Sequence, residues 1–121
     1  MKASKRKELE YLIQLITTGK LRLDDDGKIY KVGKNGTFRG ENLTGYGYYR
    51  VSVYIGNYEY IHCDSHRLIY AYHHGLDSLK DGFVINHIDY NKTNNRINNL
   101  EQITRMKNSS LGNGTNKSRI Q

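Results

Sequence analysis

Five asparagines occur within nine residues, at positions 91, 94, 95, 98 and 99. Two short apolar runs flank them, at residues 83–88 and 100–103. Runs of this kind, separated by turn-forming residues, predict two strands joined by a loop, which we call the asparagine loop (residues 89–99). Asparagine amides commonly fix loop backbone, so composition alone favours a purely structural interpretation of this loop.

The rest of the chain predicts a mixed α+β domain. Apolar residues at helical spacing predict a helix over residues 4–18, with Ser4 as its cap and Gly19 at its end. Alternating runs predict a hairpin over residues 21–32 and a second over residues 46–62. A helix is expected from His66 to about His74, and another from Thr104.

Composition limits the size of the core and suggests the partner. The 121 residues suffice for one domain with a modest core, and tyrosine supplies 11 of its aromatic side chains. The net charge of +7 is uneven, because residues 1–40 carry +5, residues 41–89 carry −3 and residues 90–121 carry +5. Basic flanks favour a polyanion held at both ends, although a soluble basic protein would have the same charge.

The single cysteine, Cys63, excludes an internal disulfide and suits a reducing compartment. Nearby histidines, including His62 and His66, raise the possibility of a zinc site. A structural tetrahedral site usually needs more cysteines, so no structural zinc is expected, and Cys63 is predicted to be a small buried residue. The chain shows neither a membrane span nor a secretory signal, which predicts a cytoplasmic protein.

The asparagine loop follows a histidine flanked by side-chain oxygens, His87 between Asn86 and Asp89. Imidazole has an ordinary pKa of about 6.5, so at cellular pH it can accept a proton from water. Amide and carboxylate oxygens are hard ligands that suit Mg²⁺. These residue types fit hydrolysis of a phosphodiester, which needs an activated water and a cation near the phosphate.

The stretch VINHIDYNKTNNRINNLEQITRMKNS, residues 84–109, resembles the HNH homing endonucleases, especially the phage and intron-encoded group. The residues 45–51, GYGYYRV, and the His66-Arg67-Leu68 step resemble upstream parts of the same group. The resemblance implies a ββα-metal fold, in which two antiparallel strands and a helix hold one divalent metal. It therefore predicts a C-terminal HNH core in a small single α+β domain that also has an N-terminal helix and antiparallel hairpins.

The resemblance also implies roles for particular residues. His87 is the general base and Asn99 stiffens the loop, while Asn86 and Asn108 bind Mg²⁺ or another divalent ion such as Mn²⁺. Asp89 either supplements the metal through water or orients the loop. His66 and Arg67 either reach the scissile phosphate or anchor their helix.

Two positions depart from the family pattern. Tyr90 stands where glycine is usual, so the turn either changes its backbone shape or accepts a bulky side chain. Asn86 stands where many relatives have aspartate, and two neutral asparagines should bind Mg²⁺ weakly unless the DNA phosphate supplies charge.

The expected organisation is a basic helix (residues 1–19), a supporting and DNA-binding region (20–82), the nuclease core (83–111) and a flexible basic tail (112–121). Double-stranded DNA is the expected partner, and a monomer is favoured. The expected DNA contacts are Arg50, Lys92, Asn94, Asn95, Arg96 and Arg105, with Lys2, Lys5, Arg6 and Lys7 as further candidates. Besides a nuclease that nicks or cuts both strands, the sequence allows a non-catalytic DNA-binding protein on a degenerate HNH scaffold.

Overall fold

A computed structural model describes residues 2–107, and the predicted tail and Asn108 lie outside this range. The described chain begins with helix α1 (Ala3–Thr17). Two antiparallel sheets follow, the first with β1 (Leu21–Leu23), β2 (Ile29–Gly33) and β3 (Gly36–Arg39), the second with β4 (Glu41–Leu43), β5 (Tyr49–Gly56) and β6 (Glu59–Asp64). Helix α2 (Ser65–His74) leads through a short 3₁₀ turn, η1 (Leu76–Ser78), to the last hairpin.

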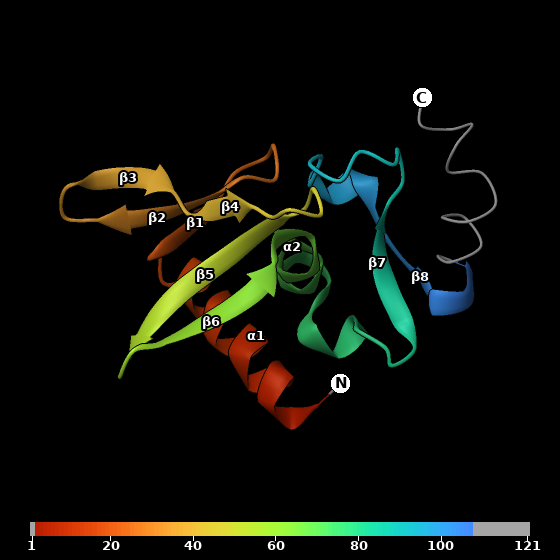
Figure 1. The fold of residues 1–121 in the computed structure, drawn as a ribbon, viewed down its shortest axis with the longest axis horizontal. Helices are drawn as coiled ribbons and strands as arrows, with labels where there is room; N and C mark the ends of the chain where they lie inside the picture. The colour runs from red at the N-terminus through yellow and green to blue at the C-terminus, as the bar shows by residue number, and fades with distance from the viewer. Residues whose placement is uncertain (1, 108–121) are drawn as a thin grey trace.

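The last hairpin pairs β7 (Phe83–His87) with β8 (Leu100–Thr104), and the 3₁₀ turn η2 (Ile97–Asn99) lies between them. In Figure 1, α2 lies between the β5–β6 hairpin and the β7–β8 hairpin, with α1 crossing below. The buried apolar residues of α1, α2 and the strands, among them Leu12, Ile29 and Leu68, form one shared core. The α+β fold class predicted from the sequence is confirmed.

Most elements lie where periodicity predicts them, because their apolar residues face the core. Leu9, Leu12 and Ile16 form the buried stripe of α1. Helix α1 starts at Ala3, and its cap position is Lys2 with no side-chain hydrogen bond, so the prediction that Ser4 caps it was wrong. At the start of the helix that follows β8, the Thr104 hydroxyl accepts a hydrogen bond from the Lys107 N–H at 3.1 Å, which confirms the predicted cap.

The sequence did not predict β3 and β4. Their side chains are exposed along β3 and at most positions of β4, so no apolar alternation marks them. The exception is Glu41, which is buried between the two sheets. Its carboxylate accepts hydrogen bonds from the Ile29 backbone and from Arg39, both at 2.9 Å. Glu41 therefore joins the two sheets through polar contacts.

No helix among residues 2–107 is long and apolar enough to span a membrane.

Candidate active site on the β7–β8 hairpin

The register of the β7–β8 hairpin decides which way each site residue faces. His87 pairs with Leu100 at the end of the ladder, and Asn86 pairs with Glu101. Since neighbouring strand residues face opposite sides, Ile85 and His87 share the buried face and Asn86 lies on the other. His87 is thus the last inward-facing residue before the asparagine loop.

His87 lies in a polar and aromatic pocket and is only 5% exposed. Its Nε2 is 2.7 Å from the side-chain oxygen of Asn95, which is itself fully buried. The Tyr48 and His66 rings lie beside it, with centroids 5.9 and 4.9 Å away. Burial lowers the pKa of His87, although the hydrogen bond to Asn95 and the charge of Asp89 act in the opposite direction. The imidazole is therefore neutral at neutral pH, as a general base must be.

His66 enters this pocket from the first turn of α2. It is buried and stacked on Tyr48 at 5.1 Å, and burial, with the charges of His87 and Arg67, lowers the pKa of His66 to about 3. Its Nδ1 has no hydrogen-bond partner among the described residues. Of the two roles predicted for His66, its buried position fits anchoring of helix α2 better than contact with a phosphate. The neighbouring Arg67 is half-buried.

Asn99 ties the two ends of the asparagine loop together. Its side-chain amide donates to the Asp89 carboxylate at 2.9 Å and to the Asn94 carbonyl at 2.8 Å, and its oxygen accepts the Asp89 N–H at 3.1 Å. Burial acts to raise the pKa of Asp89, but hydrogen bonds from Asn94, Asn91 and Asn99 outweigh it and lower that pKa. Asp89 therefore organises the loop, and its carboxylate oxygens are already engaged.

Tyr90 adopts a backbone conformation that favours glycine. Its φ is +63°, in the left-handed region, and its N–H donates to the His87 carbonyl at 3.0 Å. The loop therefore carries a bulky residue in a conformation that side-chain-bearing residues adopt at a cost.

Glu101 is a candidate site residue that sequence reasoning missed. The Asn86 amide nitrogen donates to Glu101 Oε2 at 2.8 Å across the hairpin. Glu101 could have been found from the sequence by assuming a register for the β7–β8 hairpin, because it is the residue directly opposite Asn86. Together these side chains offer hard oxygen donors of the kind that Mg²⁺ prefers.

Residues 2–107 contain no group of three or more His, Cys, Asp and Glu side chains placed to hold a metal. Asn108, predicted as a ligand, lies outside the described residues. Asn86 and Glu101 fit a divalent ion by donor chemistry, but they form only part of a coordination sphere. The remaining ligands would have to come from elsewhere, including the DNA phosphate.

The residues predicted to contact DNA divide into two groups. Asn95 is buried against His87, so its prediction as a DNA contact was wrong, and Asn94 is held within the loop by Asp89 and Arg96. Arg50 and Arg105 are exposed, and Arg50 lies 3.7 Å from Asp64. Exposed Lys92 reaches over the Tyr48 ring at 4.9 Å, beside the His87 pocket.

Other basic side chains are bound to acidic partners. Arg96 pairs with Asp26 at 2.8 Å. In the N-terminal helix, Arg6 pairs with Asp77 at 2.6 Å and Lys5 with Glu8 at 3.4 Å. Of the loop cations, Lys92 is therefore the better placed to meet a phosphate near His87.

Comparison with known proteins identifies the segment that carries this site as similar to HNH endonucleases. Residues 64–110 match the family model described as HNH endonuclease, so the match includes α2 and both strands of the last hairpin. Among solved structures, the chain is similar to the HNH homing endonuclease I-HmuI, whose structure concerns DNA binding and cleavage. The TM-score is 0.61 and the identity is 29%, over 80% of this chain and 55% of that one. The chain thus spans about half the length of that protein, and no curated protein matches it significantly.

Proposed function

We propose that the chain is a member of the HNH homing endonuclease family and an Mg²⁺-dependent DNA endonuclease in which His87 is the general base, on the strength of the match over residues 64–110 and the similarity to I-HmuI. The observation that carries the proposal is the neutral, buried imidazole of His87, which Asn95 fixes at the end of β7 within the segment that matches the HNH endonuclease model. The oxygen donors Asn86 and Glu101 lie on the other face of the same hairpin. The substrate is double-stranded DNA. A phage-encoded homing role, a monomeric state and action in the host cytoplasm are parts of the same proposal.

In the proposed reaction, His87 takes a proton from a water molecule as the water oxygen attacks phosphorus. The bond from phosphorus to the 3′ oxygen breaks, and the leaving oxygen gains a proton from solvent, giving 5′-phosphate and 3′-hydroxyl ends. Lys92, which lies over the Tyr48 ring, would bind a neighbouring phosphate, while Asn99 and Asp89 hold the loop that follows His87. A bound Mg²⁺ would add positive charge that stabilises the pentacovalent phosphate and the departing oxygen.

The proposal is tested by incubating supercoiled plasmid with the purified protein and Mg²⁺, beside a sample containing excess EDTA. We expect relaxed or linear DNA only in the presence of the metal, because Asn86 and Glu101 alone cannot offset the charge of the phosphate. DNA ligase should reseal the nicks, since their ends carry 5′-phosphate and 3′-hydroxyl groups. DNA that is retarded on a gel but stays uncut would favour the alternative, a binding protein on a degenerate scaffold.

Glu101 should govern the affinity for the metal. We expect Glu101→Gln to weaken Mn²⁺ binding about tenfold in calorimetric titration with a non-cleavable duplex, because it removes the negative charge beside Asn86. Asn86→Asp should tighten binding by a similar factor. Glu59→Gln, an exposed substitution on β6, is the matched control and should leave the affinity unchanged. Equal affinities for wild type and Glu101→Gln would contradict this role.

A further inference from the structure

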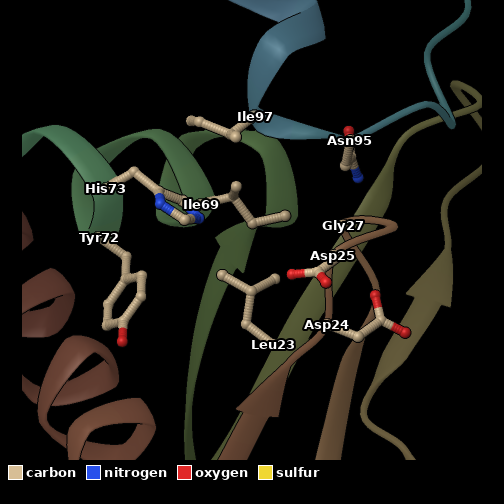
Figure 2. A pocket seen from close by; sticks show the side chains of 9 residues that line it. All are labelled: Leu23, Asp24, Asp25, Gly27, Ile69, Tyr72, His73, Asn95 and Ile97. Atoms are coloured by element: carbon tan, nitrogen blue, oxygen red, sulfur yellow. The ribbon is translucent and has the colours of Figure 1, made fainter.

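The turn between β1 and β2 (residues 24–27) lies directly against the asparagine loop, although about 70 residues separate them along the chain. Figure 2 shows Gly27 beside Asn95 at one wall of a cavity of about 110 Å³, with Asp24 and Asp25 alongside. At the outer edge of this contact, Arg96 Nη2 bonds Asp26 Oδ1 at 2.8 Å. The turn therefore contacts the peptide group that joins Asn95 to Arg96 and also the Arg96 side chain.

Gly27 leaves no space for a side chain at this contact. A Cβ on residue 27 would overlap the carbonyl carbon and oxygen of Asn95 and lie 2.7 Å from the Arg96 nitrogen. The Gly27 φ of +78° is also one that side-chain-bearing residues rarely adopt. Any substitution must therefore displace either the turn or the backbone that carries Asn95.

Asn95 in turn fixes His87. Its side-chain oxygen can only accept, so the 2.7 Å contact places the hydrogen on His87 Nε2 and leaves the lone pair on Nδ1. Both side chains are buried, so water does not compete for this hydrogen bond. The His66 ring, whose centroid is 4.9 Å from that of His87, limits how far the imidazole can rotate.

We propose that the β1–β2 turn positions the catalytic base, acting through Asn95 to hold His87 with Nε2 protonated and Nδ1 free to accept the proton of the attacking water. The inference rests on the proposed nuclease function. Asn95 and Gly27 are positioning residues, because Asn95 acts through its hydrogen bond to His87 and Gly27 through the backbone of Asn95. The competing explanation is that the turn only stabilises the fold, in which case its loss would lower stability without changing the state of His87.

The two explanations differ in the tautomer of His87, which long-range ¹H–¹⁵N NMR reports on the whole chain without DNA or metal. We expect wild type to show the Nε2-protonated form above neutral pH. Gly27→Ala should shift His87 towards a mixture of both forms and lower kcat by about 10- to 100-fold, with KM changed less than about twofold. Gly19→Ala is the matched control, since Gly19 has a similar φ of +85° but nothing within 4 Å of its added Cβ.

A second pair of variants keeps the test decisive if Gly27→Ala does not fold. Asn95→Asp retains an acceptor and should preserve the tautomer, whereas Asn95→Leu cannot accept and should lose both the tautomer and most of kcat. A folded Gly27→Ala or Asn95→Leu protein with the wild-type tautomer and kcat would overturn the inference. If wild type shows the expected tautomers but never cuts DNA, the proposed function fails while the contact between turn, Asn95 and His87 stands.

Discussion

Acidification from neutral pH to about pH 5 is expected to lower the free energy of unfolding by roughly 2 kcal/mol through His66 alone. The pKa of this buried ring falls to about 3 from the ordinary 6.5. The unfolded chain therefore binds a proton first, so the stability is complete above about pH 6.5 and is lost as the pH falls towards 3. Over that full range the loss approaches roughly 5 kcal/mol, which is comparable to the stability of a small domain.

Urea titrations followed by circular dichroism at several pH values between 7 and 5 measure this effect. This pH range stays above the pH at which the carboxyls of Asp24 and Asp89 take up protons. Burial acts to raise the pKa of each of these carboxyls, but their hydrogen bonds outweigh it and lower the pKa from 3.8. His66→Phe keeps a ring against Tyr48 without a titrating group and should remove the part of the slope that His66 causes, while burial of His87 and His73, which lowers the pKa of each, leaves a remainder. His74→Phe, a change at an exposed histidine of the same helix, should retain the slope, and a flat wild-type profile would refute the assignment.

Replacing Asn99 with alanine is expected to destabilise the protein by about 2–4 kcal/mol, because three hydrogen bonds of a buried side chain disappear. The cleavage rate should also fall about 100-fold, since the lost contacts hold Asp89 and Asn94 directly after the base. Single-turnover cleavage at saturating protein separates this effect from weaker DNA binding. Asn98→Ala is the same change at an exposed neighbour. It should alter the free energy of unfolding by no more than about 0.5 kcal/mol and the cleavage rate by no more than about twofold.

Unchanged cleavage by Asn99→Ala, with the expected loss of stability, would show that the loop is structural only.

Periodicity predicts the framework of this fold well because its apolar residues recur at helical or strand spacing. The stripe Leu9, Leu12 and Ile16 gives α1, and the runs around the asparagine loop give β7 and β8. The strands β3 and β4 do not follow from the sequence in this way, because hydrogen bonding to neighbouring strands, and not an apolar face, defines them.

The site was predictable only where spacing carries information. His87, Asn86 and Asn99 follow from the resemblance to the HNH homing endonucleases, and Glu101 needs the cross-strand register as well. Asn95 could not be told from the other asparagines of its loop, since the contact that buries it involves Gly27, far away in sequence. The burial of His66 likewise depends on Tyr48 and His87, which belong to other elements.

The central claim is that His87 activates the water that cuts DNA, and single-turnover cleavage of a duplex by wild type and His87→Ala with Mg²⁺ tests it most directly. Loss of a general base should lower the rate constant by about 10²- to 10⁴-fold, while the DNA affinity measured in EDTA stays within about threefold. Equal rate constants for the two proteins would contradict the account.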